Sequence, residues 1–555
     1  MKYLKIDRYD LWAILLILCA TGLRIFFDAL GWPPTNADEG TMGIMALHIA
    51  YNGAHPLLFY GQNYMGAMEA YLGAFFFHLF GPSLFALRLG VIFLVTLFLI
   101  STYLLTRILY SKQFGLCVLA LLCFGSIYVF TREMIATGGT SQTLLFGSLS
   151  LLLASWLSIT YHRHASWRTR LLRVPGYVCW GLAIGLGVWS DMIVLPIFVM
   201  AGLLLLLFCW RDLLWTWPLI FVSMLVGAWP IIEYNRQASK VTNSLTTLLG
   251  LFKGSTTTAP HTLAGILHGV KDTVLISMPM ATGNPFCPVM ELPWLGDNSP
   301  HVPACTVAHA FWGFGYLGLF FLSLIVTIVG LWLLRRQHPE GVDRASIVRH
   351  IARLCMLGGG LLALAGYSIS SAPIGWPGFH ARYLSTLLII TPVVLAPLWM
   401  GATAFKSHIG TFNKLVPLFS RVALALVFLL YLTGTGILIS EIPRTQLQNQ
   451  RMADLRQTLE NIGATRIYTD YWSCDNTAFL SDEHIVCAVM ETNLQVWTIH
   501  NRYPPYAAAV TSDAHATYVF PDSSQQLVTL EHKIAHSKTH YRVIKQDGYT
   551  IYQPV

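Results

Sequence analysis

Charged residues are scarce in this chain. Only 11% of its 555 residues are Asp, Glu, Lys or Arg, whereas 55% are hydrophobic, and the mean hydropathy is +0.56. A soluble globular domain carries about 25% charged residues, so the composition excludes a soluble protein. The net charge is +8, but the cations fall largely in short segments between apolar runs and not in one basic patch. This distribution is typical of membrane topology and argues against nucleic acid as a partner.

Several motifs are also missing. The sequence contains no Asn-x-Ser/Thr sequon, which favours a prokaryotic cell envelope over a secretory pathway. It has no Cys-x-x-Cys, no His-rich metal spacing and no internal repeat. The sequence therefore contains no recognisable metal-binding motif.

Ten cysteines are present, and they fall into two groups. Six lie in predicted spans, where we interpret them as packing residues: Cys19, Cys117, Cys123, Cys179, Cys209 and Cys355. The other four form two local pairs, Cys287 with Cys305 and Cys474 with Cys487. An oxidising compartment would let each pair close, but spacing alone does not decide it.

Long apolar runs predict transmembrane helices. Each has roughly 18 to 25 residues, the length that crosses about 30 Å of hydrocarbon. The runs lie near residues 11 to 30, 84 to 106, 114 to 131, 142 to 160, 215 to 233, 308 to 334, 352 to 370, 383 to 402 and 420 to 440. Residues 172 to 210 are too long for one span and are interrupted by Asp191, so we divide them into two. The prediction is a polytopic α-helical membrane protein with about eleven spans, the first of them uncleaved.

The positions of Lys and Arg predict the orientation. With the N-terminus in the cytoplasm, every basic loop lies on the inner side, as the positive-inside rule requires. A single span over residues 172 to 210 would move the loop that holds Arg335 and Arg353 to the outer side. The outer face then receives a first external loop at residues 31 to 83, a long external loop at 234 to 307, the segment "SSAPIGWPGFHARYLST" and everything after residue 441.

The last hundred residues are polar and mixed in pattern. "QLQNQRMADLRQTLENIG" and "SSQQLVTLEHKIAHSK" predict helices, "TRIYTDYW" and "HATYVF" predict strands, and Asp547-Gly548 predicts a hairpin turn. We therefore expect a membrane domain at residues 1 to 440 and a small extracytoplasmic α/β domain at 441 to 555.

The first external loop contains two adjacent acids but no Lys or Arg between residues 33 and 81. In "TNADEGTMGIMALHIAYNG", Thr35 or Asn36 can cap a helix whose first turn holds Asp38 and Glu39, and Gly53 can end it. The acids can simply complement the helix dipole. A second amphipathic stretch, "GQNYMGAMEAYLGAFFFHLFG", follows and is typical of a helix at the membrane interface. The histidines of this loop, His48 and His55, lack the spacing of a zinc pair, and we interpret them as loop residues.

The chain resembles the GT-C integral-membrane glycosyltransferases of the family-39 type, which include protein O-mannosyltransferases and lipid A aminoarabinose transferases. The resemblance rests on the Asp-Glu pair in a large first external loop, on "ALHIAYNGAHP", on "YLGAFFFHLFGPSLFALRLGVIFL" through Arg88, and on "HARYL" at the start of a late span. It covers roughly residues 8 to 440 in topology and 31 to 106 in motif detail.

The resemblance implies a glycosyltransferase that moves a hexose, with mannose as the family default, from a polyprenyl-phosphate donor to an acceptor hydroxyl on the outer face, with inversion. The acceptor is a protein, a lipid or a glycan. Asp38 matches the catalytic position of the family, and a carboxylate there can accept the proton of the attacking hydroxyl. Glu39 is the second candidate base or an orienting partner.

Cations are the expected partners of the donor phosphate. Arg382 is our first candidate, because an Arg at the outer end of a span can bind phosphate in a fork; the alternative is an interfacial side chain that snorkels. His380, Tyr383 and Arg132 are further candidates. Glu133 and Asp191 can line the site, although Glu133 stands where the family more often has Asp, can pair with Arg132, and Asp191 also suits a polar turn.

A divalent cation between the acids and the donor phosphate is compatible with the sequence but not required by it. The rival class is a transporter or flippase of lipid-linked sugar intermediates. Transporters place ionisable residues near the membrane midplane and often show repeated halves. Here the acids gather at the outer boundary, which favours the enzyme.

Overall fold

The computed structural model describes residues 7 to 253, 262 to 286, 302 to 337, 343 to 404, 412 to 536 and 539 to 555. The chain forms two compact units. We call the first the helical unit (Met1–Leu23, Phe93–Glu133 and Gly139–Ile439) and the second the mixed unit (Arg24–Ile92, Met134–Gly138 and Ser440–Val555). The mixed unit thus combines the first external loop with the C-terminal residues.

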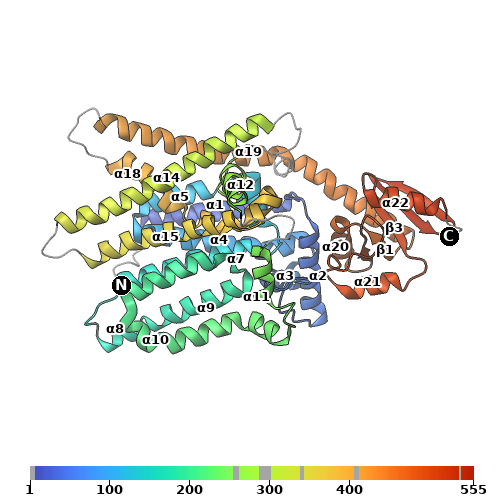
Figure 1. The fold of residues 1–555 in the computed structure, drawn as a ribbon, viewed down its shortest axis with the longest axis horizontal. Helices are drawn as coiled ribbons and strands as arrows, with labels where there is room; N and C mark the ends of the chain where they lie inside the picture. The colour runs from blue at the N-terminus through green and yellow to red at the C-terminus, as the bar shows by residue number, and fades with distance from the viewer. Residues whose placement is uncertain (1–6, 254–261, 287–301, 338–342, 405–411, 537–538) are drawn as a thin grey trace. The chain divides into compact units, whose positions relative to one another are not determined.

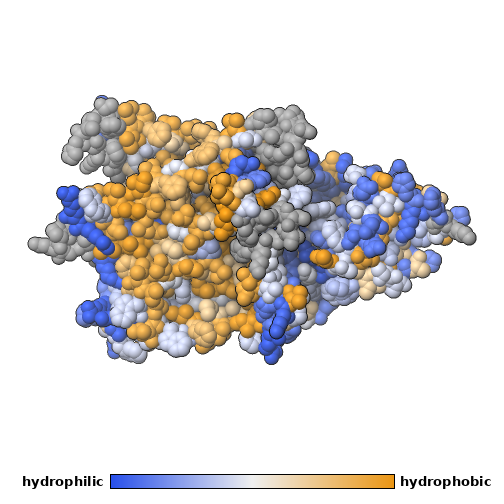
Figure 2. All heavy atoms as spheres, viewed as in Figure 1, coloured by the Kyte–Doolittle hydropathy of each residue, from blue (hydrophilic) through white to orange (hydrophobic). Residues whose placement is uncertain are grey.

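Long apolar helices dominate the chain (Figure 1). They are α1 (Arg8–Ala29), α4 (Leu84–Leu109), α5 (Lys112–Leu122), α6 (Ile127–Met134), α7 (Thr140–Ile159), α9 (Val174–Ser190), α10 (Leu195–Gln237), α14 (Val302–Gln337), α15 (Arg344–Ile369), α18 (Thr391–Ala404) and α19 (Phe412–Asn461). Among the described residues, eight helices are long and apolar enough to cross a membrane, or ten if each of two bent pairs is one span. Figure 2 shows apolar residues spread over the surface of the helical unit. The predicted membrane fold is confirmed.

Two of the spans are bent. Helices α5 and α6 meet at 92°, and the segment Pro377–Leu388 meets Thr391–Thr403 at 61°. The second bend contains the short helices α17 (Pro377–His380) and η4 (Ala381–Leu388). Shorter elements also occupy the connections: α8 (Trp167–Leu171), η1 (Met192–Val194), α11 (Ser244–Lys253), α12 (Leu263–Asp272), η2 (Thr273–Ser277), α13 (Met278–Ala281) and α16 (Ala372–Gly375).

Helix α10 is too long for one span. Its 43 residues would extend about 65 Å at 1.5 Å per residue, twice the thickness of the hydrocarbon core. The helical conformation is interrupted at Cys209, whose φ is −124° and ψ is 15°. The predicted division before this helix is confirmed, because α9 ends at Ser190 and Asp191 separates it from η1.

Contacts with α9 show that α10 reverses direction. In its first arm, Phe198 lies against Gly187 and Gly202 faces Trp180, so this arm runs antiparallel to α9. In its second arm, Ser223 lies against Gly181 and Ala228 against Gly185, so this arm runs parallel to α9. If each bent pair is one span and the two arms are counted separately, the described residues contain eleven candidate spans, the number that the sequence predicts.

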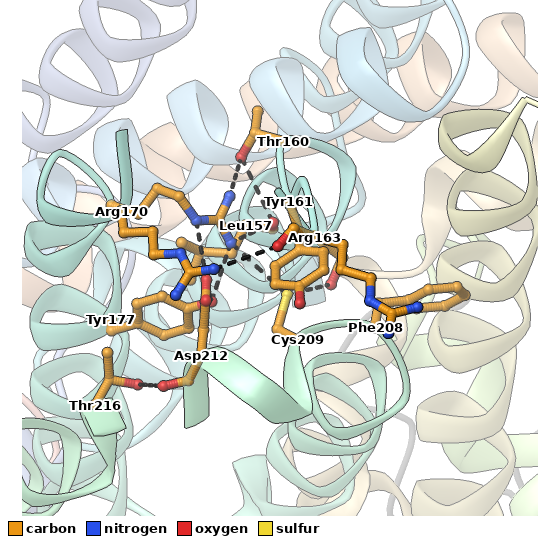
Figure 3. Close-up of polar contacts among 12 residues, drawn as sticks. Leu157, Thr160, Tyr161, Arg163, Arg170, Tyr177, Phe208, Cys209, Asp212 and Thr216 are labelled. Atoms are coloured by element: carbon orange, nitrogen blue, oxygen red, sulfur yellow. Dashed lines mark hydrogen bonds and ion pairs between the residues drawn. The ribbon is translucent and has the colours of Figure 1, made fainter. Parts of the chain in front are cut away.

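A buried polar cluster holds the reversal (Figure 3). Arg173 donates from Nε to Oδ2 of Asp212 at 3.2 Å and from Nη1 to the hydroxyl of Thr160 at 2.7 Å. Tyr177 donates its hydroxyl to the same carboxylate oxygen at 3.0 Å. The side chains of Arg173 and Asp212 are both 5% exposed, and Cys209 lies 3.8 Å from the guanidinium. The cluster therefore joins the ends of α7 and α9 to the second arm of α10.

The mixed unit contains a five-stranded sheet in the order β2-β1-β3-β5-β4. The strands are β1 (Arg466–Thr469), β2 (Val486–Val489), β3 (Thr517–Pro521), β4 (Tyr541–Gln546) and β5 (Tyr549–Pro554). Strand β1 pairs in parallel with β2 and β3, and β5 pairs antiparallel with β3 and β4. Helices α20 (Tyr471–Leu480), α21 (Pro504–Thr511) and α22 (Gln525–Ile534) complete the domain, while α2 (Ala37–Asn52) and α3 (Met68–Phe80) come from the first external loop.

Local predictions in this unit are confirmed where turn chemistry decides them. The hairpin turns at Asp547 and Gly548, whose φ angles are 48° and 89°, and Ser524 caps α22. The strand predicted over "TRIYTDYW" is shorter than expected, because Asp470 caps a new helix that begins at Tyr471. The last span and the first C-terminal helix are one continuous helix, α19.

A disulfide joins Cys474 of α20 to Cys487 of β2, with the Cα atoms 5.5 Å apart. One of the two candidate pairs therefore closes. The other includes Cys287, which lies outside the described residues.

We predict that Asp212→Asn destabilises the protein by about 3–5 kcal/mol, because it leaves the buried Arg173 cation without its counter-ion. Thermal unfolding of the full chain in detergent measures the effect. Glu233→Gln is the matched control, since Glu233 pairs with Arg236, whose side chain is 75% exposed, and such pairs contribute about 0–1 kcal/mol. Equal unfolding midpoints for the two variants would contradict the prediction.

Candidate active site

Helix α2 presents the acidic pair at its first turn. Asn36 caps the helix, with its side-chain oxygen accepting from the N–H of Glu39 at 3.0 Å. Gly53 ends the helix in the left-handed region, at φ 65°. The predicted start and stop of this helix are confirmed. Because consecutive helical residues point about 100° apart, Asp38 and Glu39 face different surroundings.

Glu39 is fully buried and fully engaged. Arg88 donates from Nε to Oε1 at 2.8 Å and from Nη2 to Oε2 at 2.6 Å, and the N–H of Ala136 donates to Oε1 at 3.1 Å. Arg88 also lies 3.5 Å from Asp28. A carboxylate held in this fork binds its cation strongly. The geometry favours the orienting role predicted for Glu39 over the role of a base.

A second carboxylate of the first loop holds the same short segment. Glu69 accepts from the N–H of Gly138 at 2.8 Å. Gly138 lies two residues after Ala136, whose N–H donates to Glu39. Gly138 has φ +84°, and a Cβ there would lie 2.6 Å from Sδ of Met65. Only glycine fits this position without strain.

Asp38 faces the C-terminal part of the mixed unit. Its Oδ1 accepts from the hydroxyl of Tyr471 at 2.9 Å and from Nη2 of Arg502 at 3.3 Å. Arg502 also donates to the Tyr471 hydroxyl, at 3.1 Å. Both hydrogen bonds that Asp38 accepts from the described residues use Oδ1, and its side chain is 14% exposed. Within the described part of the chain, the arrangement fixes the carboxylate through one oxygen and leaves Oδ2 for an incoming group.

The partners of Asp38 have perturbed acidities. Burial raises the pKa of Tyr471, and Asp38 raises it further. Burial alone would lower the pKa of Arg502, but Tyr471 and Asp38 outweigh it, so that pKa is raised. At neutral pH, Tyr471 therefore remains a hydroxyl donor and Arg502 remains a cation.

A second acid lies behind this group. Asp475 is 4% exposed and accepts from the hydroxyl of Thr41 at 2.5 Å. Burial raises the pKa of Asp475 to about 6, although Thr41 and Arg502 oppose the shift. The carboxyl group therefore changes charge just below neutral pH.

Sequence reasoning did not find Tyr471, Arg502 or Asp475. Tyr471 and Asp38 are 433 positions apart, and Arg502 and Asp38 are 464 apart, so no local spacing connects them. The only signal was indirect: Asp475 follows a cysteine that was a candidate for a disulfide.

The interpretation of His48 as a loop residue is wrong. His48 lies in α2, is 5% exposed, and its Nε2 lies 2.7 Å from Oε1 of Glu483. Its Nδ1 lies 3.0 Å from the hydroxyl of Tyr60, and Tyr506 donates a short hydrogen bond to Glu483. This group fastens the far end of the helix that carries Asp38. His55 does lie in a loop.

In the helical unit, two arginines flank one aromatic ring. Cζ of Arg132 lies 5.9 Å and Cζ of Arg382 4.8 Å from the centroid of Phe379. Cζ of Arg132 also lies 5.4 Å from the ring centroid of Tyr128, and Cζ of Arg382 lies 5.2 Å from that of Tyr383. Each distance suits a cation–π contact.

A small cavity lies between these arginines. Its lining includes Arg132, Glu133 and Arg382, so the structure brings these predicted residues together. The Nε of Arg132 is buried and has no hydrogen-bond partner within the described part of the chain. Such a donor can serve an anion that enters the cavity.

The remaining predicted residues have structural contacts. Nδ1 of His380 lies 2.8 Å from the carbonyl oxygen of Ala372, and its ring stacks on Tyr383 at 5.5 Å. Asp191 accepts from the N–H of Ile193 at 3.0 Å and caps η1. Its polar-turn interpretation fits this geometry.

One group of potential metal ligands occurs among the described residues. In the described ranges, the one group of three His, Cys, Asp or Glu ligands within 4.8 Å is Cys474, Asp475 and Cys487. Both sulfurs belong to the disulfide and cannot act as thiolate ligands. These residues therefore do not fit a divalent cation.

We predict that Asp475→Asn stabilises the protein above pH 6 but not below pH 4. The folded pKa of about 6 exceeds the reference value of 3.8, so the folded state binds more protons between these values and stability falls as the pH rises through this window. Asn removes this penalty, which is at most about 3 kcal/mol, and can still accept from Thr41. Thermal unfolding at pH 4 and pH 7 tests this, with Asp513→Asn as control, because the side chain of Asp513 is 25% exposed. An equal gain at both pH values would contradict it.

Comparison with solved structures shows which known fold the chain resembles. No protein-family model matches the chain, and no curated protein sequence matches it. Among solved structures, ArnT from Cupriavidus metallidurans in the apo state superposes with a TM-score of 0.57 and 13% identity, covering 98% of this chain and 97% of that one. The same protein bound to undecaprenyl phosphate gives a TM-score of 0.52 and 15% identity, with 98% of each chain covered.

A weaker likeness links the chain to the apo oligosaccharyltransferase of Archaeoglobus fulgidus, with a TM-score of 0.47, 12% identity, and 94% of this chain and 70% of that one covered. That score is too low to support an argument. ArnT is a lipid A aminoarabinose transferase and a GT-C membrane glycosyltransferase. The chain is an integral membrane protein with the fold of ArnT, and the resemblance to GT-C glycosyltransferases that its sequence predicts is confirmed at the level of the fold.

Proposed function

We propose that this protein is a glycosyltransferase that moves a sugar from a polyprenyl-phosphate donor to an acceptor hydroxyl at the outer face of the membrane. One observation carries the proposal. Asp38 stands at the start of a capped helix, is fixed through Oδ1 by Tyr471 and Arg502, and keeps Oδ2 open. The ArnT-like fold supports it, because ArnT has been solved with undecaprenyl phosphate bound.

The reaction assigns a role to that open oxygen. The acceptor oxygen attacks C1 of the donor sugar while its proton passes to Oδ2 of Asp38. The bond between C1 and the phosphate oxygen breaks, and its electron pair leaves with the polyprenyl phosphate. Because attack and departure occur on opposite faces of C1, the configuration is inverted. A positioned carboxylate contributes about 10²–10⁴-fold to such a step.

The departing phosphate requires positive charge. Arg132 and Arg382 line one cavity, and both retain the planar fork that matches phosphate oxygens. We assign the donor phosphate to this pair, with Tyr383 and His380 as neighbours of Arg382. Stabilising the charge that develops on the leaving group is a major contribution to transfer reactions of this kind.

Several finer assignments belong to the same proposal. The transferred sugar is a hexose, with mannose as the first candidate. The protein is placed in the inner membrane with its N-terminus in the cytoplasm, a membrane domain at residues 1 to 440 and an extracytoplasmic domain at 441 to 555. The reaction as assigned to these residues requires no metal ion and is compatible with a divalent cation beside the donor phosphate.

We expect Asp38→Asn to lower the transfer rate about 10²–10⁴-fold, because the amide cannot accept the acceptor proton. Transfer of label from a radiolabelled polyprenyl-phosphate hexose to envelope membranes measures this. Asp513→Asn is the matched control, since Asp513 also lies near an arginine, at 3.5 Å from Arg466, and its side chain is 25% exposed against 14% for Asp38. Full turnover by Asp38→Asn would remove the proposed base.

Arg382→Ala should weaken binding of undecaprenyl phosphate about tenfold to a hundredfold, the value of one to two hydrogen bonds to a charged group. Native mass spectrometry of the full chain measures this without knowledge of the donor sugar. Arg382→Lys should retain part of the affinity, and the exposed Arg335→Ala should retain all of it. Unchanged affinity of Arg382→Ala would exclude Arg382 from the phosphate site.

A further inference from the structure

Four aromatic side chains form a strip on the C-terminal part of the mixed unit. Tyr471 and Trp472 begin α20, and Trp497 and His500 lie in the segment between β2 and α21. The ring of Tyr471 lies 5.0 Å from that of Trp472 and 4.8 Å from that of His500, which in turn lies 3.7 Å from that of Trp497. We call these four residues the aromatic strip.

The aromatic strip begins at the proposed base. Tyr471 belongs to the strip through its ring and to the acid group through its hydroxyl, which donates to Asp38 at 2.9 Å. Arg502 lies over the same ring, with Cζ 5.7 Å from its centroid. A molecule bound along the strip therefore lies next to the carboxylate that would take its proton.

The aromatic strip is partly open to solvent. Tyr471, Trp497 and His500 are half-buried, and none of the four residues belongs to the core cluster of Met490, Leu494, Phe520, Leu527, Leu530 and Tyr552. Trp472 is 60% exposed, although burial of an aromatic side chain of this size is strongly favourable. An exposed aromatic surface of this kind is typical of a binding site.

The polar groups of the strip suit hydroxyls better than anions. Burial and the nearby Arg502 lower the pKa of His500, with Asp38 opposing the shift, so the ring is neutral at physiological pH and offers one donor and one acceptor. The charge of Arg502 is matched by Asp38 at 3.3 Å. The strip thus offers aromatic faces and neutral hydrogen-bonding groups without a net positive charge.

We propose that the aromatic strip binds a sugar ring of the acceptor, so that the acceptor is a saccharide or a saccharide-bearing molecule. A pyranose ring has an apolar C–H face that packs on aromatic rings and a rim of hydroxyls that hydrogen-bonds to groups such as His500 and Tyr471. The proposal rests on the proposed function, because it takes Asp38 as the base. It makes Tyr471, Trp472, Trp497 and His500 residues that determine acceptor specificity.

Saturation-transfer difference NMR on the full chain in detergent tests this with the methyl glycosides of glucose, galactose, mannose and N-acetylglucosamine as probes. We expect at least one glycoside to show saturation transfer that falls at least tenfold in Trp472→Ala and in Trp497→Ala. Trp472→Phe, which keeps an aromatic ring, should retain most of the signal. Trp167→Ala is the matched control, because Trp167 is 67% exposed and lies in α8 of the helical unit.

Each of the other possible results leads to a different conclusion. Absence of a glycoside signal that depends on Trp472, or such a signal only with a Ser- or Thr-containing peptide, overturns the proposal. A second result would also overturn the proposal: brominated phosphatidylcholine in nanodiscs quenches the fluorescence of Trp472. The Trp472 signal is obtained as the difference from Trp472→Phe, and quenching would show that the strip is a membrane anchor. Asp38→Asn should bind the glycosides as the wild type does. If that variant also kept full turnover, the proposed base would fall while the aromatic strip would still be judged on binding alone.

Discussion

The buried pair of Glu39 and Arg88 is the interaction on which the geometry around Asp38 depends. Two charge-assisted hydrogen bonds join the first turn of α2 to the start of α4, and the N–H of Ala136 adds a third bond to the same carboxylate. Both side chains are at most 1% exposed, so removal of either partner would leave an uncompensated buried charge. Because Glu39 points inward, its neighbour Asp38 is turned toward Tyr471 and Arg502. A structural acid thus orients a candidate catalytic acid one residue away.

The same principle explains why residues 33 to 81 contain acids but no Lys or Arg. Each of the three carboxylates of α2 and of the start of α3 receives its partner from another segment: Arg502 for Asp38, Arg88 for Glu39 and the N–H of Gly138 for Glu69. A buried carboxylate requires such a partner. The loop therefore needs no cations of its own. Its three carboxylates instead bind groups in other segments of the mixed unit, of which Arg502 belongs to the C-terminal residues.

Features that depend on neighbouring residues could be predicted from the sequence, whereas features that depend on residues far apart in the chain could not. Asn36 and Gly53 delimit α2, Asp191 separates α9 from α10, and Asp547-Gly548 turns a hairpin, because each depends on a few neighbouring residues. The reversal at Cys209 was located to within a few residues, between the apolar stretches that end at residue 210 and begin at 215. The ion pair that holds it was not found, since Arg173 and Asp212 are 39 positions apart. The environment of Asp38 depends on residues 433 and 464 positions away, and neither has a local signature. The candidate base was thus accessible to sequence reasoning, whereas the groups that position it were not.

The cavity of the helical unit brings together two positive charges. Arg132 and Arg382 both lie within 6 Å of the ring centroid of Phe379, at 5.9 and 4.8 Å, and like charges in a medium of low dielectric constant raise each other's energy. Glu133 lines the same cavity and offsets one positive charge. Asp191 also interacts electrostatically with Arg382. A phosphate ester supplies the charge and the oxygens that two guanidinium groups can share. In the proposed reaction the arginine pair would hold the donor phosphate, whereas Asp38, already fixed by Tyr471 and Arg502, would meet only the acceptor.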